Sequence, residues 1–395
     1  MPRNGIVIIG NYGATNVGDE AVLSGLLTLA KQSSSKPITV LSYDPARTAD
    51  EHGCEAAPLL PFGIRSFLRF DWLHSFRLLA RSAEVWIGGG ALFTDEKLFA
   101  VFLWGWHVLW GRLLCGRVSL VANTVGPIRT AKGRFLMRMI LPMLHSASVR
   151  DSESEATLRS LGFSRKITVG ADPAFLIEPI AGVTREKTII VSLRPWIRET
   201  PGLLADLASW IDARSDEGYR VILLPFQTMH DDDRVVLCEL YSHVARRDSV
   251  ELVNEAERLP AIMKRIASAE LVVGMRLHSL ILSAVQGTPF IGLSYSDKVT
   301  NFCRAVGREE SCFDLGKWNR DAFWQQVDRI LVDREEVHSS LLKVRDGMRQ
   351  AALALTQGLT VPHTTSGSPA RSRSIRTRRK RGKARGEASS RAVCG

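Results

Sequence analysis

The sequence lacks several features that would narrow its function at once. None of its six cysteines forms a C-x-x-C pair, so the spacing typical of zinc and dithiol redox sites is absent. No apolar run reaches the roughly 20 residues of a membrane span, and the 14 residues 98–111 predict a buried or interfacial helix instead. Scattered thiols in a chain of 395 residues indicate a reduced, cytoplasmic protein.

The chain also lacks an evenly distributed positive charge, although its net charge is +11. Residues 371–391 carry +9 of it, which leaves only +2 for residues 1–370. The body is therefore not expected to bind nucleic acid, and an anionic membrane surface is at least as good a partner for the basic tail. Since no aromatic residue follows Val361, residues 361–395 are expected to be disordered.

Short β-branched runs alternate with amphipathic segments along most of the chain, which is the βαβ pattern of parallel, doubly wound sheets. The apolar run 5–10 is too short for a signal peptide and predicts a first strand. One sheet rarely holds so many strands, so we predict two α/β domains that face each other across a cleft. Their expected bounds are 1–180 and 186–355, with the break near 178–187 and a helical stretch over 319–350. The predicted strands are 6–9, 38–42, 84–87, 118–122, 148–149, 167–169, 188–192, 220–224, 250–252, 271–273 and 290–293.

Two glycine-containing loops follow strands of the first predicted domain. The first reads GNYGATNVGDE, which has neither the spacing of a dinucleotide loop nor the Gly-Lys-Ser/Thr of a P-loop. Its acidic residues would repel a phosphate, so it forms either a tight turn or a pocket for neutral sugar hydroxyls. The second loop, at 88–90, either approaches a ligand closely or packs a helix on the sheet. The candidate acceptor ligands here are Asn11, Asn16, Asp19, Glu20, Gly89 and Gly90.

Cationic residues follow strands of the second predicted domain. Arg276, Leu277 and His278 stand where a strand leads into a helix expected over 279–286, and an arginine beside a helix N-terminus is typical of an anion site. Each cation alone could simply be solvated, but the group suits a small di- or trianion. The other members are Arg194, His230 and Lys298.

Three further segments have both a structural and a functional interpretation. Ser152 and Glu155 have the spacing of a capping box, while the neighbouring Arg150 could face the cleft. Asp172, before Pro173, ends a strand or binds a hydroxyl. The basic, aromatic stretch 64–81 is either a helix packed on the first domain or, together with 98–111, a peripheral membrane contact.

Taken together, the motifs resemble the polysaccharide pyruvyl transferase family over roughly residues 5–305. The matching pieces, in family order, include GNYGATNVGDEAVL, IGGGALF, VGPI, VRDSESEATLRSLG, ADPAF, VSLRPW, LLPFQTMHDDDR and VVGMRLHSLILSAVQGTPFIGLSYSDKV. The resemblance implies two Rossmann-like domains in a GT-B-like arrangement, phosphoenolpyruvate as donor, a sugar of a cell-wall or extracellular polysaccharide as acceptor, and neither a redox cofactor nor a metal. It assigns donor binding to Arg276, Leu277 and His278, and places the arginine after the domain break at Arg194.

The residues and the resemblance lead to a mechanistic hypothesis. Arg276 would hold the phosphate of the donor, and Arg194, with Lys298, its carboxylate. His278 or His230 would be the acid, and Asp19, Glu20 or Asp172 the base. The alternatives are a GT-B glycosyltransferase that uses a nucleotide sugar and, from another class, a non-enzymatic protein that binds nucleic acid or an anionic surface through its tail. A lipid-linked acceptor would place the protein at the inner face of the membrane.

Overall fold

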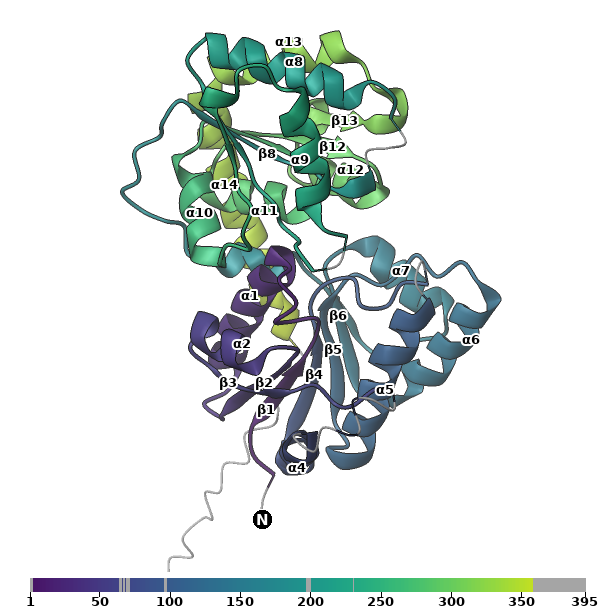
Figure 1. Ribbon diagram of the computed structural model, residues 1–395. Helices are drawn as coiled ribbons and strands as arrows, with labels where there is room; N and C mark the ends of the chain where they lie inside the picture. The colour runs from purple at the N-terminus through teal and green to yellow at the C-terminus, as the bar shows by residue number, and fades with distance from the viewer. Residues whose placement is uncertain are drawn as a thin grey trace, which may run out of the picture. The chain divides into compact units, whose positions relative to one another are not determined.

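Two parallel sheets organise the computed structural model, which describes residues 3–63, 66, 68, 72–95, 98–196, 200–229 and 231–357. The first sheet has the order β3-β2-β1-β4-β5-β6-β7 and the second the order β10-β9-β8-β11-β12-β13 (Figure 1). The strands of the first sheet are β1 (Ile6–Ile9), β2 (Ile38–Ser42), β3 (Glu55–Pro58), β4 (Glu84–Gly88), β5 (Val118–Asn123), β6 (Ser146–Val149) and β7 (Ile167–Val169). Those of the second are β8 (Thr188–Ser192), β9 (Arg220–Leu223), β10 (Val250–Leu252), β11 (Leu271–Gly274), β12 (Phe290–Ser294) and β13 (Cys312–Asp314).

Helices follow nearly every strand, as the alternating pattern predicts. The first half contains α1 (Val17–Ser33), α2 (Pro45–His52), α4 (Trp72–Arg81), α5 (Leu98–Leu114), α6 (Ala131–Ile140), α7 (Ser152–Ser160) and the 3₁₀ turn η2 (Pro173–Leu176). The second half contains α8 (Leu203–Asp216), α9 (Asp233–His243), α10 (Leu259–Ser268), α11 (Leu277–Gln286), α12 (Asp297–Ala305), α13 (Arg320–Val332) and α14 (Arg334–Leu353). Among the residues that the structure describes, no helix is both long and apolar enough to cross a bilayer.

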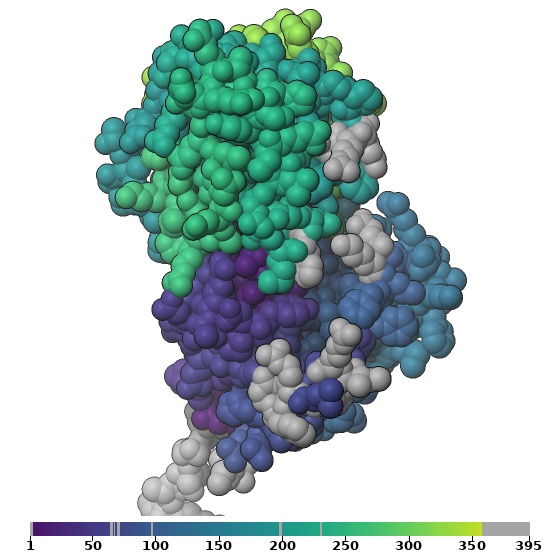
Figure 2. Space-filling view, in the orientation of Figure 1, coloured from purple at the N-terminus to yellow at the C-terminus, as the bar shows by residue number. Residues whose placement is uncertain are grey.

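Three apolar clusters hold these layers together. One lies between the first sheet and α4, α5, α6 and α7, and another between the second sheet and α8, α9 and α13. The third contains residues of both halves, from α1 and η2 to α10, α11 and α14. Figure 2 shows the purple N-terminal segment against the green surface of the second half. The two halves therefore share an apolar core, which fixes the strand ends of the first sheet relative to those of the second.

The last helix belongs to both halves of the chain. It follows α13, which packs on the second sheet, and it ends against η2 of the first half. Arg349, near its end, pairs with Glu178, and the hydroxyl of Thr168 on β7 donates to the carbonyl of Gln357 over 3.1 Å. The chain therefore crosses between the halves twice, once before β8 and once along α14.

The sequence predicts the central strands and the edge strands β7 and β10, and it misses the two other edge strands. Five predicted ranges coincide with β1, β2, β7, β8 and β10, and the other six differ by one or two residues. The unpredicted strands are β3 (EAAP) and β13 (CFD), each at the edge of its sheet. Both are short, half-exposed and free of Val, Ile and Thr, so neither shows an apolar run.

Each sheet has one point at which the chain reverses its direction of growth. In the first sheet β1 lies between β2 and β4, and in the second β8 lies between β9 and β11. Ligands of open α/β sheets bind beyond the carboxyl ends of strands at such points. Most of the predicted site residues follow β1, β4, β8 and β11, and therefore lie at these two places.

Candidate functional site

The loop after β1 ends in a helix cap that presents Asp19. Asn16 is the N-cap of α1, and its side chain accepts from the amide of Gly18 over 3.0 Å. Asp19 follows in the first turn, and Asn11 Nδ2 donates to its Oδ2 over 2.7 Å. Burial raises the pKa of Asp19 to about 6, against the opposing effects of the Asn11 hydrogen bond and the nearby His278. A carboxyl group with this pKa can exchange a proton near neutral pH.

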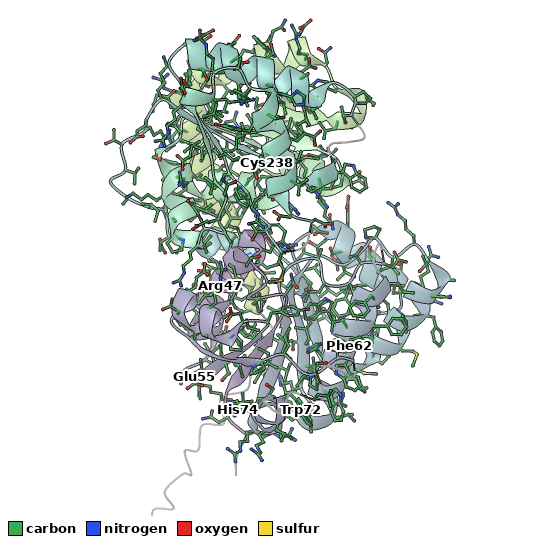
Figure 3. The ribbon with its side chains drawn as sticks, in the orientation of Figure 1. Arg47, Glu55, Phe62, Trp72, His74 and Cys238 are labelled. Atoms are coloured by element: carbon green, nitrogen blue, oxygen red, sulfur yellow. The ribbon has the colours of Figure 1, made fainter. Side chains whose placement is uncertain are left out.

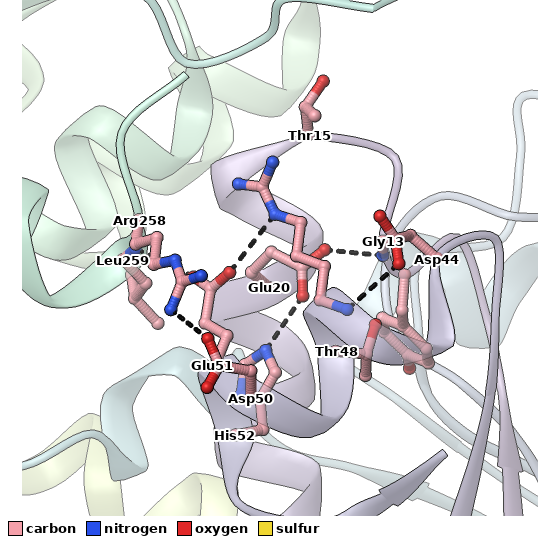
Figure 4. A network of polar contacts seen from close by, with 12 residues as sticks. Gly13, Thr15, Glu20, Asp44, Thr48, Asp50, Glu51, His52, Arg258 and Leu259 are labelled. Carbon is pink, nitrogen blue, oxygen red and sulfur yellow. Dashed lines mark hydrogen bonds and ion pairs between the residues drawn. The ribbon is translucent and has the colours of Figure 1, made fainter. Parts of the chain in front are cut away.

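Glu20, the next residue, has a different role. Its Oε1 accepts from the amide of Gly13 over 2.8 Å, and its Oε2 lies 2.9 Å from Nε2 of His52 on α2 (Figure 4). The side chains of Glu20 and His52 are both 4% exposed. Both carboxylate oxygens are thus engaged inside the protein, so Glu20 fixes the first loop instead of facing an acceptor.

The network around Glu20 continues to the second half of the chain. On α2, Glu51 lies 3.5 Å from Arg47 and accepts from the backbone amide of Leu259, the first residue of α10, over 2.9 Å (Figure 4). Arg258, just before α10, pairs with Asp50 over 2.5 Å. These contacts connect α2 to the N-terminus of α10. Since His52 of α2 also contacts Glu20, they fix the position of the first loop relative to the second half.

The second glycine loop packs against α1 and Asp19. Gly89 and Gly90 have φ values of 69° and 72°, a conformation that favours glycine. A Cβ atom on Gly89 would lie 2.2 Å from Cγ1 of Val22, and one on Gly90 would lie 2.9 Å from Oδ1 of Asp19. Because Gly89 and Gly90 have no side chains, the backbone after β4 can pack closely against α1. This packing places the backbone next to the Asp19 carboxylate.

His278, on the first turn of α11, lies against the start of α1. A Cβ atom on Gly18 would lie 2.4 Å from its Nδ1, and its Nε2 lies 3.5 Å from Oδ2 of Asp172. The imidazole is 15% exposed. A histidine from the second half and an aspartate from the first half, Asp19, are thus neighbours at the N-terminus of α1.

Arg150 completes this group, although the sequence left it outside the predicted site. It follows β6, pairs with the Asp172 carboxylate, and donates from Nη2 to the hydroxyl of Thr124 over 2.7 Å. Burial alone would raise the pKa of Asp172, but Arg150 and His278 hold that pKa well below its usual range. Asp172 therefore remains a carboxylate and acts as the partner of Arg150 and His278. We call Asn11, Asp19, Arg150, Asp172 and His278 the Asp19 cluster.

A second group of charged residues lies at the carboxyl ends of β8, β9 and β11. Arg276, the N-cap residue of α11, donates from Nε to both carboxylate oxygens of Asp233 over 3.0 and 3.1 Å. Its Nη2 donates to the carbonyl of Asp231 over 2.9 Å. Asp233 is fully buried, and burial raises its pKa despite the opposing effect of Arg276. The guanidinium is therefore held in one orientation by two residues.

Arg194 is more loosely paired than Arg276. Its Nη2 lies 3.6 Å from Oδ2 of Asp231, and its guanidinium lies 4.5 Å from the centre of the Tyr295 ring. Its buried Nε has no hydrogen-bond partner among the described residues. A stacked arginine with unused donors is well suited to an anionic ligand. We call Arg194, Asp231, Asp233 and Arg276 the arginine cluster.

The two clusters are connected through their loops. The amide of Val17 donates to the carbonyl of Phe226 over 3.0 Å, and the hydroxyls of Thr15 and Thr228 are 3.0 Å apart. Asn16 also forms a β-bridge with Gln227. The loop that carries Asp19 and the loop that carries Asp231 are therefore joined by direct contacts.

The remaining predicted residues have different positions. The side chain of Leu277 packs against the core shared by both halves, and Lys298 lies half-buried on the first turn of α12. His230 lies outside the described residues, as do parts of the stretch 64–81 and the tail 361–395.

Two predicted helix starts are wrong. Helix α11 begins at Leu277, two residues before the expected start. Among the described residues no side chain caps its N-terminus, so its first amide groups can donate hydrogen bonds to an anion. Helix α7 is capped by Asp151, whose side chain accepts from Ser154, and not by Ser152. The sequence DSES offers two capping residues in succession, and their spacing alone does not decide between them.

A separate cavity of about 280 Å³ lies on another side of α1. Its lining includes Lys31, His52, Glu178 and Met263, and none of the predicted site residues. It is lined in part by charged groups of opposite sign, and it lies away from the carboxyl ends of β1 and β4. We therefore take the two clusters, not this cavity, as the candidate functional site.

The paired Rossmann-like sheets and the polar site at their reversal points define an α/β protein of the GT-B-like class. A UDP-N-acetylglucosamine 2-epimerase from Methanocaldococcus jannaschii has this fold, with a TM-score of 0.61 at 13% identity over 90% of this chain and 99% of that one. The Anabaena protein HepE, solved with UDP and glucose, has a TM-score of 0.59 at 10% identity over 90% and 98% of the two chains. At these identities the likeness concerns the fold alone.

The sequence comparisons define the family more narrowly. The model of the polysaccharide pyruvyl transferase family matches residues 16–297, and the chain belongs to this family. An amylovoran biosynthesis protein from Erwinia amylovora, AmsJ, is 22% identical over 86% of this chain and 94% of its own. The predicted resemblance and the predicted fold class are both confirmed, and the family's transferases act on polysaccharide.

Proposed function

We propose that this protein transfers a pyruvyl group from phosphoenolpyruvate to two hydroxyls of one sugar in a polysaccharide or its precursor, and releases phosphate. The observation that carries the proposal is the neighbourhood of the two clusters. The Asp19 carboxyl group, with a pKa of about 6, lies beside His278. Arg276 of the arginine cluster precedes His278 by two residues, at the start of α11. Acid–base groups and anion-binding groups thus surround one place.

The arginine cluster supplies the donor site in this proposal. Phosphoenolpyruvate carries a phosphate and a carboxylate, and the uncapped start of α11 together with Arg276 suits the phosphate. Arg194, whose Nε has no hydrogen-bond partner in the part of the chain that the structure describes, suits the carboxylate, and Lys298 on α12 adds a further cation. Because Asp233 orients Arg276, its guanidinium needs little reorganisation when the donor binds.

The Asp19 cluster supplies the chemistry. The oxygen of the first sugar hydroxyl attacks C2 of phosphoenolpyruvate, and Asp19 accepts the proton of that hydroxyl. His278 donates a proton to C3. The double bond is thereby consumed, and a tetrahedral phosphoketal forms. The second hydroxyl then displaces phosphate from C2 and loses its own proton, which closes the cyclic ketal. No electron is gained or lost overall, so the reaction requires no redox cofactor.

The acceptor contacts follow from which side chains remain available. Glu20 and Asn16 are engaged in the loop and the helix cap, and Asp172 is paired with Arg150. Asp19 and Asn11, beside the backbone of Gly90, are the groups that can meet sugar hydroxyls. We therefore reduce the predicted acceptor set to these three residues, with Gly89 as the support of the loop.

The test is an assay of phosphate release from phosphoenolpyruvate with a panel of glycoside acceptors, including lipid-linked ones. Release that depends on an acceptor, with a ketal in the product, supports the proposal. The same panel with UDP-sugars in place of phosphoenolpyruvate is the control. Release of nucleotide with glycosyl transfer, and no reaction of phosphoenolpyruvate, would replace the proposal with a nucleotide-sugar glycosyltransferase.

A further inference from the structure

One outer surface of the first half combines exposed apolar side chains with positive charge. It is formed by α4, α5 and α6, which lie on the same side of the first sheet and pack against its core cluster (Figure 1). We call it the α4–α6 face. It is separate from the candidate site, which lies at the carboxyl ends of the strands.

The three helices contain no aspartate or glutamate at all. Their arginines and lysine are all exposed, whereas the charge of residues 1–370 as a whole is only +2. The face is therefore a local concentration of positive charge on a nearly neutral body. Its cations are Arg77, Arg81, Arg112, Lys132, Arg134 and Arg138.

Large apolar side chains project from the same helices into solvent. On α5, Phe99, Phe102 and Leu113 are 63%, 49% and 64% exposed, and on α6, Phe135 and Met139 are 64% and 53% exposed. Every exposed Phe and Leu among the described residues belongs to these helices or to the segment just before α4. Apolar exposure of this extent, gathered in one place, marks an interaction surface.

The exposed residues are not the core residues of these helices. Val101, Trp104 and Val108 of α5, and Met137 and Ile140 of α6, already fill the cluster under the sheet. Helices α5 and α6 therefore have two apolar faces. One is buried against the sheet, and the other is exposed to solvent. On α6, Phe135 and Met139 are one turn apart, with Arg134 and Arg138 beside them, which is the pattern of a helix at a membrane interface.

Aromatic rings of α4, α5 and the segment before α4 pack against one another beneath the exposed side chains. Phe76 of α4 contacts Trp72 and Trp110 in edge-to-face geometry, with ring centres 5.4 and 4.8 Å apart. Trp106 contacts Trp110 at 5.5 Å, and Phe62 contacts Phe99 at 5.3 Å. Figure 3 shows Phe62 and Trp72 on this side of the molecule. Tryptophans beside exposed apolar groups are characteristic of proteins at the level of lipid headgroups.

We propose that the α4–α6 face docks on the anionic leaflet of a lipid bilayer. The exposed phenylalanines and Met139 would enter the headgroup region, and the six cations would pair with lipid phosphates. A second copy of this chain fits poorly, because two sets of these helices, which carry cations and no aspartate or glutamate, would repel each other. The inference does not depend on which donor or sugar the enzyme uses.

The test is flotation of the full-length chain with vesicles of phosphatidylcholine alone and of an equal mixture with phosphatidylglycerol. Binding is expected on the mixed vesicles, and it should weaken as salt concentration rises. Phe99→Ser/Phe102→Ser and Arg134→Glu/Arg138→Glu should each reduce the bound fraction roughly tenfold or more. All four side chains are exposed, so circular dichroism should show unchanged folding.

Matched controls separate the face from the basic tail, which every variant retains. Lys264→Glu/Lys317→Glu makes the same change in net charge at exposed positions of the second half. Val235→Ser/Val332→Ser removes exposed apolar groups from the second half. Both controls should bind like the unchanged protein. If the α4–α6 variants also bind unchanged, another part of the chain carries the binding and the proposal is wrong.

A second outcome would also overturn it. Light scattering measures the mass of the chain in solution with and without the substitutions. If the unchanged protein is oligomeric, does not bind either vesicle, and becomes monomeric in the Phe99→Ser/Phe102→Ser variant, the face is an interface between copies. A face that binds neither vesicles nor copies would leave the apolar exposure to another protein, which again contradicts the proposal.

Discussion

The reversal points of the two sheets have the same topology and opposite chemistry. The first, between β1 and β4, presents the Asp19 carboxyl group beside a glycine backbone, and the second, between β8 and β11, presents two arginines. In both, one charged residue is clamped by the protein and another is left available. Glu20 is clamped where Asp19 is available, and Arg276 is clamped where Arg194 is loosely paired. In each half, one charged side chain is thus fixed by protein contacts and a second is less constrained, although the proposed function also assigns the fixed Arg276 to the donor.

The largest effect should come from Asp19→Asn. The amide keeps the size and can still accept from Asn11, but it cannot take a proton. We expect kcat for phosphate release to fall about 100- to 10,000-fold, with a small change in KM for phosphoenolpyruvate. A large change in KM with kcat retained would mean that Asp19 serves the donor, and the division between the two clusters would fail.

The pH dependence sharpens the same assignment. If the carboxylate is the active form, kcat should fall about tenfold per unit below pH 6, and the residual activity of Asp19→Asn should lack this limb. Stability should change in the opposite sense. Because the folded pKa of Asp19 lies above its unfolded value, its ionisation costs stability as pH rises from about 4 to about 6. Thermal unfolding at pH 8 should therefore give Asp19→Asn a slightly higher Tm than the unchanged protein.

Arg276→Met should be the most damaging change for stability. It leaves the fully buried Asp233 carboxylate without its cation, which costs about 3–5 kcal/mol in the free energy of unfolding. Adding Asp233→Asn should restore much of that stability in denaturant melts without restoring donor binding. If the double variant also recovers its KM for phosphoenolpyruvate, Arg276 is only a structural residue.

Arg194→Met tests the loosely paired arginine. Its ion pair with Asp231 is long, and Asp231 is 48% exposed, so little stability should be lost. We expect KM for phosphoenolpyruvate to rise about 10- to 100-fold, because one charge-assisted contact disappears. Initial rates against donor concentration measure this. Arg194→Lys should recover only part of the loss, since a lysine cannot make two parallel hydrogen bonds.

The smallest effect is expected for His52→Gln, which weakens the support of the first loop. The buried Glu20 would lose its 2.9 Å contact, at a cost of about 1–3 kcal/mol in unfolding free energy. Activity should fall only a few-fold, in kcat. If His52→Gln were as inactive as Asp19→Asn at a temperature where both are folded, the distinction between holding and reacting residues in this loop would be lost.

The parts of the site that the sequence predicts are those that depend on position after a strand. The strands β1, β8 and β11 contain runs of β-branched residues that are easily recognised in the sequence. The structure places the residues that follow them near the strand ends, namely Asp19, Arg194, Arg276 and His278. The sequence does not distinguish the roles of Asp19 and Glu20. Consecutive residues on a helix point about 100° apart, so one faces the strand ends and the other faces α2, and only the neighbours decide which.

Contacts between distant segments account for the rest. The pairing of Arg276 with Asp233 joins residues 43 positions apart, and no local pattern indicates it. The role of Arg150 depends on Asp172, which reaches it from beyond the next strand. The sequence does not predict the edge strands β3 and β13 because, unlike the edge strands β7 and β10, they contain no Val, Ile or Thr, and only pairing with a neighbouring strand reveals them.

The third glycine of the first loop has a consequence for how the protein could be divided. Gly18 leaves the space that the ring of His278 fills, so one hydrogen atom in place of a methyl group lets a helix of one half touch a catalytic candidate of the other. In the proposed mechanism Asp19 of the first half and His278 of the second act as one acid–base pair, so each half supplies one member of it. Recombining halves from different relatives would therefore succeed or fail at this contact, whatever sugar or donor specificity each half brought with it.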